Sequence, residues 1–196
     1  LLDTKMRNFK YLASSISEEK MVKLLNKYYF YADKVSQLYN GTVSYCSDDE
    51  VLINFSTAQF IEEQAFYAIC AAQLFLYLAD DINDIDDSTA NAKFKLAVHS
   101  GKTISGLYSP ITQKIDNLTG KTLDLTRAIC DECPNNSVLI SASAFEHAGA
   151  GTRIEADEFG GSEQDRINIY IGLEPMSEYR LLLKRQANQL VSLFSK

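Results

Sequence analysis

Two cysteines separated by two residues, Cys130 and Cys133, are the first candidates for chemistry in this sequence. A zinc site with this spacing needs a second pair of ligands, and a thioredoxin motif needs its own fold context; neither accompanies them. The only two histidines, His99 and His147, are too few for a His-rich metal site. We therefore interpret the cysteines as free thiols at a helix end, and His99 as a structural residue.

Acidic residues gather at two further places. The segment 80–87 is rich in Asp but lacks the Gly and the closing Glu of an EF-hand, which indicates a solvated loop. Asp48 and Asp49 lie between two β-type runs, 42–46 and 50–55, which predicts a β-hairpin with an acidic tip. Such a pair can ligate a divalent cation and is also common turn chemistry, so both interpretations stay open. No P-loop, GxSxG or GxGxxG string occurs.

Helices and strands alternate in the hydrophobic pattern around these residues. A first strand is expected at the start of the sequence. Helices are expected at 14–39, with Ser17 as N-cap, and at 57–81, 120–129, 142–148 and 177–194. Further strands are expected in the hairpin, at 93–99, around Ile104, at 138–140 and at 167–171. Long helices alternating with hairpins indicate an α+β fold, with helices packed on a largely antiparallel sheet.

Composition limits the class of protein. The 196 residues, 46% of them hydrophobic, predict one compact domain, and the net charge of −7 disfavours binding to nucleic acid or to anionic membranes. Cysteines in apolar stretches indicate a reducing, cytoplasmic location. The apolar run 65–79 is shorter than the ~20 residues of a membrane span, which predicts a buried helix. Without an initiator Met or a visible signal peptide, we expect a piece of a longer chain.

Several short motifs, taken in order, resemble a class III nucleotidyl cyclase domain. They are residues 9–12, 16–17, 24–29, 41–43 and 49–55 in the first half, and 96–101, Gly106, 120–125 and 138–141 in the second. The resemblance covers residues 1–149 and implies a ferredoxin-like βαββαβ core. We place the cyclase homology domain at 1–174 and a C-terminal helix, packed on it or extending from it, at 175–196.

The resemblance also implies where the family's metal ions would bind. Family members bind a nucleoside triphosphate at a dimer interface, where two aspartates hold two Mg²⁺ ions and the ribose 3′-hydroxyl attacks the α-phosphate. The first metal position falls on Lys5, with Asp3 two residues away, and the second falls on Asp49. Since a cation reverses the local electrostatics, we expect the Lys5 ammonium to occupy the space of a metal ion and to pair with Asp49.

The other positions of the family's site also differ. The two residues that select the base fall on Tyr45 and Asn117, which are candidates for nucleotide binding; Tyr45 also fits sheet packing, and Asn117 also fits a turn. The transition-state Asn falls on Asp124 and the Arg on Ala128, with Arg127 adjacent. Because one residue turns a helical side chain by ~100°, we expect Arg127 to point elsewhere.

These departures predict a catalytically inactive cyclase-like domain, without a metal cofactor, that serves as a dimerising or regulatory module of a larger bacterial-type signalling protein. The expected partner is a second copy or a related domain, and the expected location is the cytoplasmic side of an inner-membrane protein. Two alternatives stay open. One is a divergent cyclase making cyclic AMP or GMP with Mg²⁺ or Mn²⁺, in which Asp3 and Arg127 reach the site by register shifts. The other is a nucleotide sensor without turnover.

Overall fold

A seven-stranded sheet with helices on both faces forms the fold. The computed structural model describes residues 1–56, 61–85, 90–107, 116–149, 152–162, 167–175 and 177–194. Its helices are α1 (Phe9–Ser15), α2 (Glu18–Leu38), α3 (Ile61–Asn83), α4 (Lys121–Glu132), α5 (Ala142–His147) and α6 (Ser177–Phe194). Its strands are β1 (Leu2–Met6), β2 (Thr42–Cys46), β3 (Glu50–Asn54), β4 (Phe94–Val98), β5 (Ile104–Leu107), β6 (Asp116–Thr119), β7 (Ser137–Ser141), β8 (Ile154–Ser162) and β9 (Ile167–Pro175).

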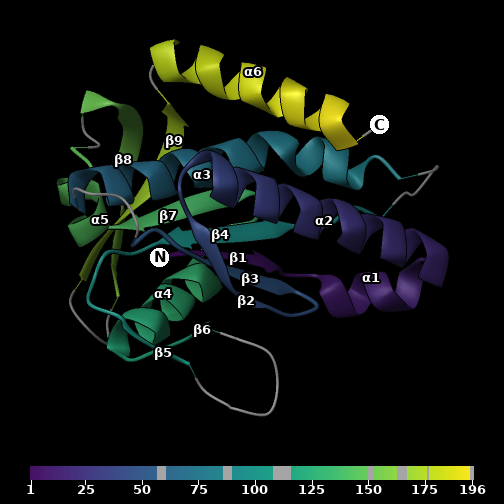
Figure 1. The fold of residues 1–196 in the computed structure, drawn as a ribbon, viewed down its shortest axis with the longest axis horizontal. Coiled ribbons are helices and arrows are strands. Elements are labelled where there is room, and N and C mark those ends of the chain that lie inside the picture. The colour runs from purple at the N-terminus through teal and green to yellow at the C-terminus, as the bar shows by residue number, and fades with distance from the viewer. Residues whose placement is uncertain are drawn as a thin grey trace.

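The strand order of the main sheet is β2-β3-β1-β4-β7-β9-β8, and β5 pairs with β6 in a separate ribbon. All neighbours in the main sheet are antiparallel except β4 and β7. Figure 1 shows α2 and α3 on one face of the sheet, α6 lying over α3, and α4 on the opposite face. This arrangement confirms the predicted α+β fold with a largely antiparallel sheet and a C-terminal helix.

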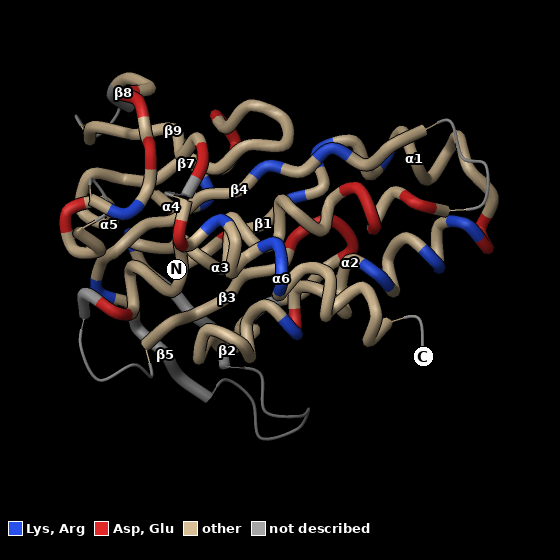
Figure 2. Tube along the Cα trace, turned by 90° about the horizontal axis from the view of Figure 1, so that it is seen from above, with Lys and Arg blue, Asp and Glu red and all other residues tan. Residues whose placement is uncertain are grey.

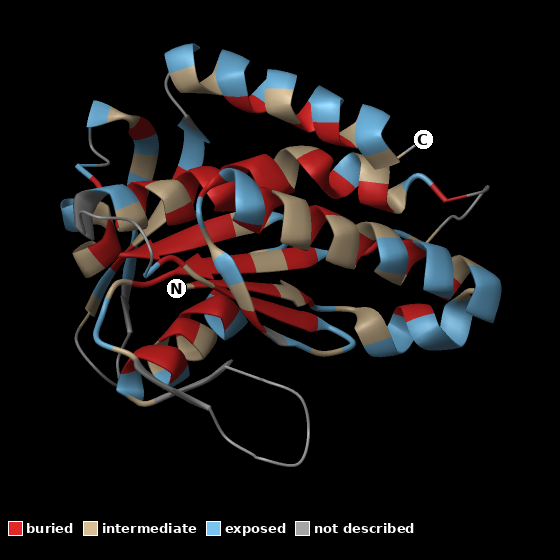
Figure 3. Cartoon of the chain, viewed as in Figure 1, coloured by how far each residue is buried: buried red, intermediate tan, exposed pale blue. Residues whose placement is uncertain are grey.

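The main hydrophobic core lies between the sheet and helices α2 and α3, as the buried surfaces in Figure 3 show. Strand β1 runs through the middle of the sheet, and its side chains alternate between the faces. Leu2 and Met6 join the main core, and Tyr28 of α2 donates a hydrogen bond to the backbone oxygen of Thr4 at 2.9 Å. The remaining positions of β1, Asp3 and Lys5, therefore face α4.

The predicted helix 14–39 is wrong at its start, because the chain forms two helices there. The backbone is extended at Ile16 and Ser17, and the Ser17 hydroxyl accepts a hydrogen bond from Lys20 N at 3.4 Å. Ser17 is thus the N-cap of α2, as predicted, and separates α2 from α1. At the other end, Asn40 takes a left-handed φ of 56°, and a Cβ on Gly41 would lie 2.8 Å from Ile53, so the helix stops close to its predicted end at residue 39.

Helix α3 extends through part of the predicted acidic loop. Its last turn is held by Lys27 of α2, whose ammonium donates to the backbone oxygen of Asp81 at 2.6 Å, so residues 80–83 are helical. From Glu63 to Asn83 the helix is long and apolar enough to cross a membrane by length and composition, but 67% of that stretch is buried inside the fold. The prediction of a buried helix is confirmed, while the argument from its short length is wrong. Residues 57–60 and 86–89 lie outside the described residues.

Candidate active site

Three charged side chains stand in a row across the middle of the sheet. Lys5 of β1 lies directly opposite Glu50 of β3 on one side and opposite Lys95 of β4 on the other. Directly opposite residues of antiparallel strands project to the same face, so all three side chains face α4. Two cations side by side repel each other unless an anion lies close to both.

Helix α4 supplies that anion near its C-terminus. The Lys5 ammonium donates to Asp131 Oδ1 at 2.7 Å, and the Lys95 ammonium donates to the backbone oxygen of Asp131 at 2.5 Å. The last carbonyl groups of a helix carry partial negative charge, which favours a cation at this end. Burial opposes the charged form of Lys5, but the hydrogen bond that Lys5 donates to Asp131 and the negative charge of an ionised Asp3 outweigh it and raise the Lys5 pKa.

One turn earlier, Arg127 pairs with the third member of the row. Its Nε donates to Glu50 Oε1 at 2.8 Å and its Nη2 donates to Glu50 Oε2 at 3.1 Å, a bidentate pair. The Glu50 side chain is only 11% exposed, and that of Arg127 is 34% exposed. Arg127 is therefore directed at β3 and fixed in orientation.

Beneath this row lies Asp3, which has no exposed surface. Neither of its carboxyl oxygens has a hydrogen-bond partner among the residues that the structure describes, and the nearest cation, the Lys5 ammonium, is 3.9 Å from Oδ2. Burial and then the charge of Glu50 raise the pKa of Asp3 to about 8, against the opposing effects of Lys5 and Arg127. Burial without hydrogen-bond donors therefore favours the neutral form of the Asp3 carboxyl.

An open pocket of about 470 Å³ adjoins the row, lined by Lys5, Arg7, Asp49, Glu50, Lys95 and Asp131 among others. The structure thus brings Lys5 and Asp49 to one pocket, but the predicted ion pair between them is wrong. The strand register places Lys5 opposite Glu50, and Asp131 of α4 takes its ammonium. Asp49 is exposed at the hairpin tip, where its Oδ1 accepts a hydrogen bond from the Ser47 hydroxyl at 3.4 Å.

Known structures share this arrangement of strands and helices. The chain matches the guanylyl cyclase Cya2 (TM-score 0.76, 18% identity, 91% of this chain and 92% of that one) and the adenylyl cyclase CyaB from P. aeruginosa (0.80, 16%, 88% and 92%). It also matches a dimeric guanylyl cyclase domain of the RhoGC fusion protein from Blastocladiella emersonii (0.76, 15%, 89% and 94%). The chain has the nucleotidyl cyclase fold. No protein-family model and no curated protein sequence matches it.

The other residues that the sequence resemblance assigns to the family's site lie apart from the charged row, or their side chains lie outside the described part of the chain. Asp124 is exposed in the first turn of α4, at the end opposite Asp131, and Ala128 follows one turn later. The Cα of Tyr45 pairs with Leu52 after a bulge at Ser44 that breaks the predicted alternation with Val43. Asn117 lies on β6 opposite Gly106. The side chains of Tyr45 and Asn117 lie outside the described part of the chain.

The residues around the charged row do not fit the two metal ions of the cyclase fold. In the part of the chain that the structure describes, no group of three or more His, Cys, Asp or Glu side chains is arranged to hold a metal ion. Glu50 and Asp131 already bind cationic side chains. The Lys5 ammonium, at the position that the sequence resemblance assigns to the first metal ligand, would repel a divalent cation.

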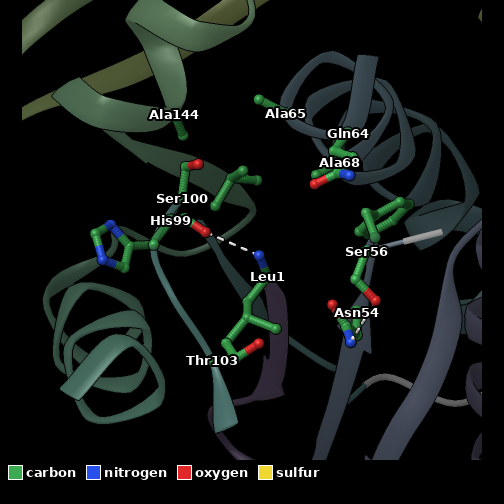
Figure 4. Close-up of a pocket in the computed structure, with 13 residues that line it drawn as sticks. Leu1, Asn54, Ser56, Gln64, Ala65, Ala68, His99, Ser100, Thr103 and Ala144 are labelled. Carbon is green, nitrogen blue, oxygen red and sulfur yellow. Dashed lines mark hydrogen bonds between the residues drawn. The ribbon is translucent and has the colours of Figure 1, made fainter. Parts of the chain in front are cut away.

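The other sequence candidates have structural roles. Cys130 and Cys133 are free and buried, and burial raises the pKa of both thiols, so they are poor nucleophiles. His99 Nδ1 lies 2.8 Å from the Ser141 hydroxyl, and burial, followed by the charge of the Leu1 amino group, lowers the His99 pKa to about 4. Figure 4 shows the His99 ring directed away from Leu1 beside a small pocket, and the Leu1 amino group donates to the His99 backbone oxygen at 2.8 Å.

Sequence reasoning missed Glu50, Lys95 and Asp131, although a signal for each was present. Glu50 interrupts an apolar strand at the position after the hairpin tip, and Lys95 does the same between Phe94 and Leu96. A charged residue inside a central strand needs a partner on the covering layer. Asp131 lies between Cys130 and Cys133 at the end of a helix, where an acidic residue opposes the helix dipole unless a cation binds it.

Proposed function

We propose that this chain is a catalytically inactive cyclase-fold domain that serves as a dimerising or regulatory module of a larger signalling protein. The observation that carries the proposal is the Lys5 ammonium, which is held by Asp131. The sequence resemblance assigns Lys5 to the position of the family's first metal-binding aspartate. Two unit charges 4 Å apart near a protein surface interact by about 4 kcal/mol, and a divalent cation doubles this repulsion. The pocket therefore disfavours Mg²⁺ or Mn²⁺, and we propose that the domain uses no metal cofactor.

The geometry of Asp3 and Arg127 argues against the alternative of an active cyclase. That alternative needs both side chains at the site, whereas Asp3 has no exposed surface and Arg127 is bound to Glu50. Nucleotide binding without turnover is a second candidate, favoured only by the basic residues Arg7 and Lys95 along the pocket. Titration calorimetry with ATP and GTP, each with and without Mg²⁺, would detect such binding.

We expect no turnover. The purified chain, incubated with ATP or GTP and either Mg²⁺ or Mn²⁺, should form no cyclic nucleotide above background when the product is measured by mass spectrometry, with an active cyclase assayed in parallel. Product formation that is lost in Asp49→Ala and kept in the neighbouring Asp48→Ala would overturn the proposal in favour of a divergent cyclase.

We also expect weak self-association. The proposal gives the domain a second copy or a related domain as its partner, and the similarity to a dimeric cyclase domain supports this. Restoring a natural upstream segment should strengthen association, because a tethered contact raises the local concentration. Sedimentation across a concentration series should show monomer and dimer in exchange for both lengths of chain. A strict monomer in both cases would instead favour a partner of different sequence.

Free, mostly buried thiols support a cytoplasmic setting. The net charge is −7, and Figure 2 shows acidic residues interspersed with basic ones along the described chain. Of the four free cysteines, Cys70, Cys130 and Cys133 are buried, as is common in a reducing compartment. We propose that the domain lies on the cytoplasmic side of an inner-membrane protein.

A further inference from the structure

Lys5 lies between two carboxyl groups, one exposed to solvent and one buried. Its ammonium is 2.7 Å from Asp131 Oδ1 and 3.9 Å from Asp3 Oδ2. The Asp131 side chain is 68% exposed and belongs to the last turn of α4, whereas that of Asp3 is fully buried on β1. A lysine has a flexible four-carbon stem, so a small rotation of this stem can carry the ammonium from one carboxyl group to the other.

The other groups around Asp3 cannot respond in the same way. Several ionisable groups interact electrostatically with Asp3: Lys5 of its own strand, Glu50 of β3, Tyr28 of α2, and Arg127, Cys130 and Asp131 of α4. Lys95 of β4 is farther away, because Asp3 pairs with Ala97, two residues along that strand. Arg127 is fixed by its bidentate pair with Glu50. Cys130 contributes a weak contact, its Sγ 3.9 Å from the backbone oxygen of Asp3.

We propose that Lys5 is the moving part of a proton-controlled latch between β1 and α4: while Asp3 is neutral Lys5 holds Asp131, and when Asp3 ionises Lys5 turns to Asp3 and releases the last turn of α4. The proton that leaves the Asp3 carboxyl passes to water. The latch rests on the proposed function, because a divalent cation beside Asp3 would stabilise its ionised form.

The unequal burial of the two carboxylates gives the latch its direction. A buried carboxylate without hydrogen-bond donors is strongly unfavourable, so an ionised Asp3 attracts the nearest mobile cation. Asp131 loses less when Lys5 leaves, because water can solvate its exposed carboxylate. Since burial raises the pKa of Asp3 to about 8, the change falls within a range of pH in which the rest of the fold can be studied.

Release of Asp131 removes the side-chain ion pair between this end of α4 and β1. The bond from Lys95 to the Asp131 backbone oxygen and the weak contacts of the Cys130 thiol with the sheet remain. Helix α4 carries Arg127 and borders the open pocket through Asp131. Ionisation of Asp3 therefore loosens one wall of the candidate site.

Nuclear magnetic resonance of the whole chain tests the latch directly. The ¹³C shift of the Asp3 carboxyl and the ¹⁵N shift of Lys5 Nζ are followed from pH 5 to pH 9.5, together with hydrogen exchange of the α4 amides. We expect Asp3 to titrate with a midpoint above 7. The Lys5 Nζ shift, and the protection of the amides of residues 129–132 relative to their intrinsic exchange rate at each pH, should change with that same midpoint. An Asp3 midpoint below 5, or a Lys5 signal that stays flat through the Asp3 titration, overturns the proposal.

Two variants give shifts of opposite sign. Asp131→Asn frees Lys5 for Asp3 and removes a negative charge, so the Asp3 midpoint should fall by one pH unit or more. Lys5→Met removes the cation but keeps the apolar stem, so the midpoint should rise. Asp124→Asn, on the same helix but exposed at its far end, is the matched control and should leave the midpoint unchanged. Equal midpoints in Asp131→Asn and Lys5→Met would show that Lys5 does not move between the two carboxyl groups.

Discussion

Replacing Asp3 with Asn is expected to raise the free energy of unfolding, by an amount that grows between pH 5 and pH 8. The fold raises the pKa of Asp3 from its ordinary value of 3.8 to about 8, so between these values the folded chain keeps a proton that the unfolded chain releases. The wild-type fold therefore loses stability as the pH rises toward 8 and no further above it. Asn resembles the protonated acid in shape and cannot ionise, so the variant lacks this loss.

The expected size of the effect is large for one substitution. Each unit of pKa difference corresponds to about 1.4 kcal/mol, so the advantage of Asp3→Asn should grow by roughly 2–4 kcal/mol from pH 5 to pH 8. Urea unfolding at a series of pH values measures it. Other titrating groups, His99 included, are common to both chains and cancel in the difference. Asp124→Asn should change stability by the same small amount at every pH. Parallel pH curves for wild type and Asp3→Asn would show that Asp3 is ionised in the fold.

Loss of Arg127 is expected to have the second largest effect. Arg127→Met leaves the carboxylate of Glu50, which is 11% exposed, without its bidentate partner. Removing one member of a buried ion pair typically costs about 3–5 kcal/mol, and the partial exposure of Arg127 reduces this to roughly 2–3 kcal/mol. Urea unfolding at pH 7 gives the value.

A double-mutant cycle separates the pair from simple loss of packing. Glu50→Gln removes the charge that Arg127 neutralises. The loss in free energy of unfolding in the double variant should therefore be smaller than the sum of the two single losses, by at least about 1 kcal/mol. Arg180 and Glu174 form an exposed pair with 2.6 Å between Nη1 and Oε2, and Arg180→Met should cost at most about 1 kcal/mol. Equal losses in Arg127→Met and Arg180→Met would contradict a stabilising role for the Glu50 pair.

Local sequence patterns were sufficient for most of the fold. The turn at Asn40-Gly41, the acidic tip before Glu50 and the cap at Ser17 are each set by a few neighbouring residues, and the structure has all of them. Contacts between distant segments were harder to predict. The last turn of α3 is helical because Lys27 binds it, and no pattern within residues 80–87 contains that information.

In the candidate site, too, local patterns predicted the positions of residues, whereas contacts between distant segments could not be predicted. The alternation of β1 correctly places Asp3 and Lys5 on one face, and the motif order places Asp49 near them. The partner of Lys5 depends on where the end of α4 crosses the sheet, a distance of 126 residues along the chain. The absence of a hydrogen-bond partner for Asp3 among the described residues depends on that crossing too, because α4 is what covers it.

The register that sets Lys5 between Glu50 and Lys95 makes the substitution of Lys5 by an acidic residue unfavourable. Lys5→Asp would not restore a metal centre by itself, because it would add a carboxylate beside Glu50 and above the buried Asp3 while releasing Asp131 from its cation. Each acid that was tolerable with Lys5 present would then repel its neighbours. A metal centre at this place would therefore need coordinated changes on β1, β3 and α4 rather than the single substitution Lys5→Asp.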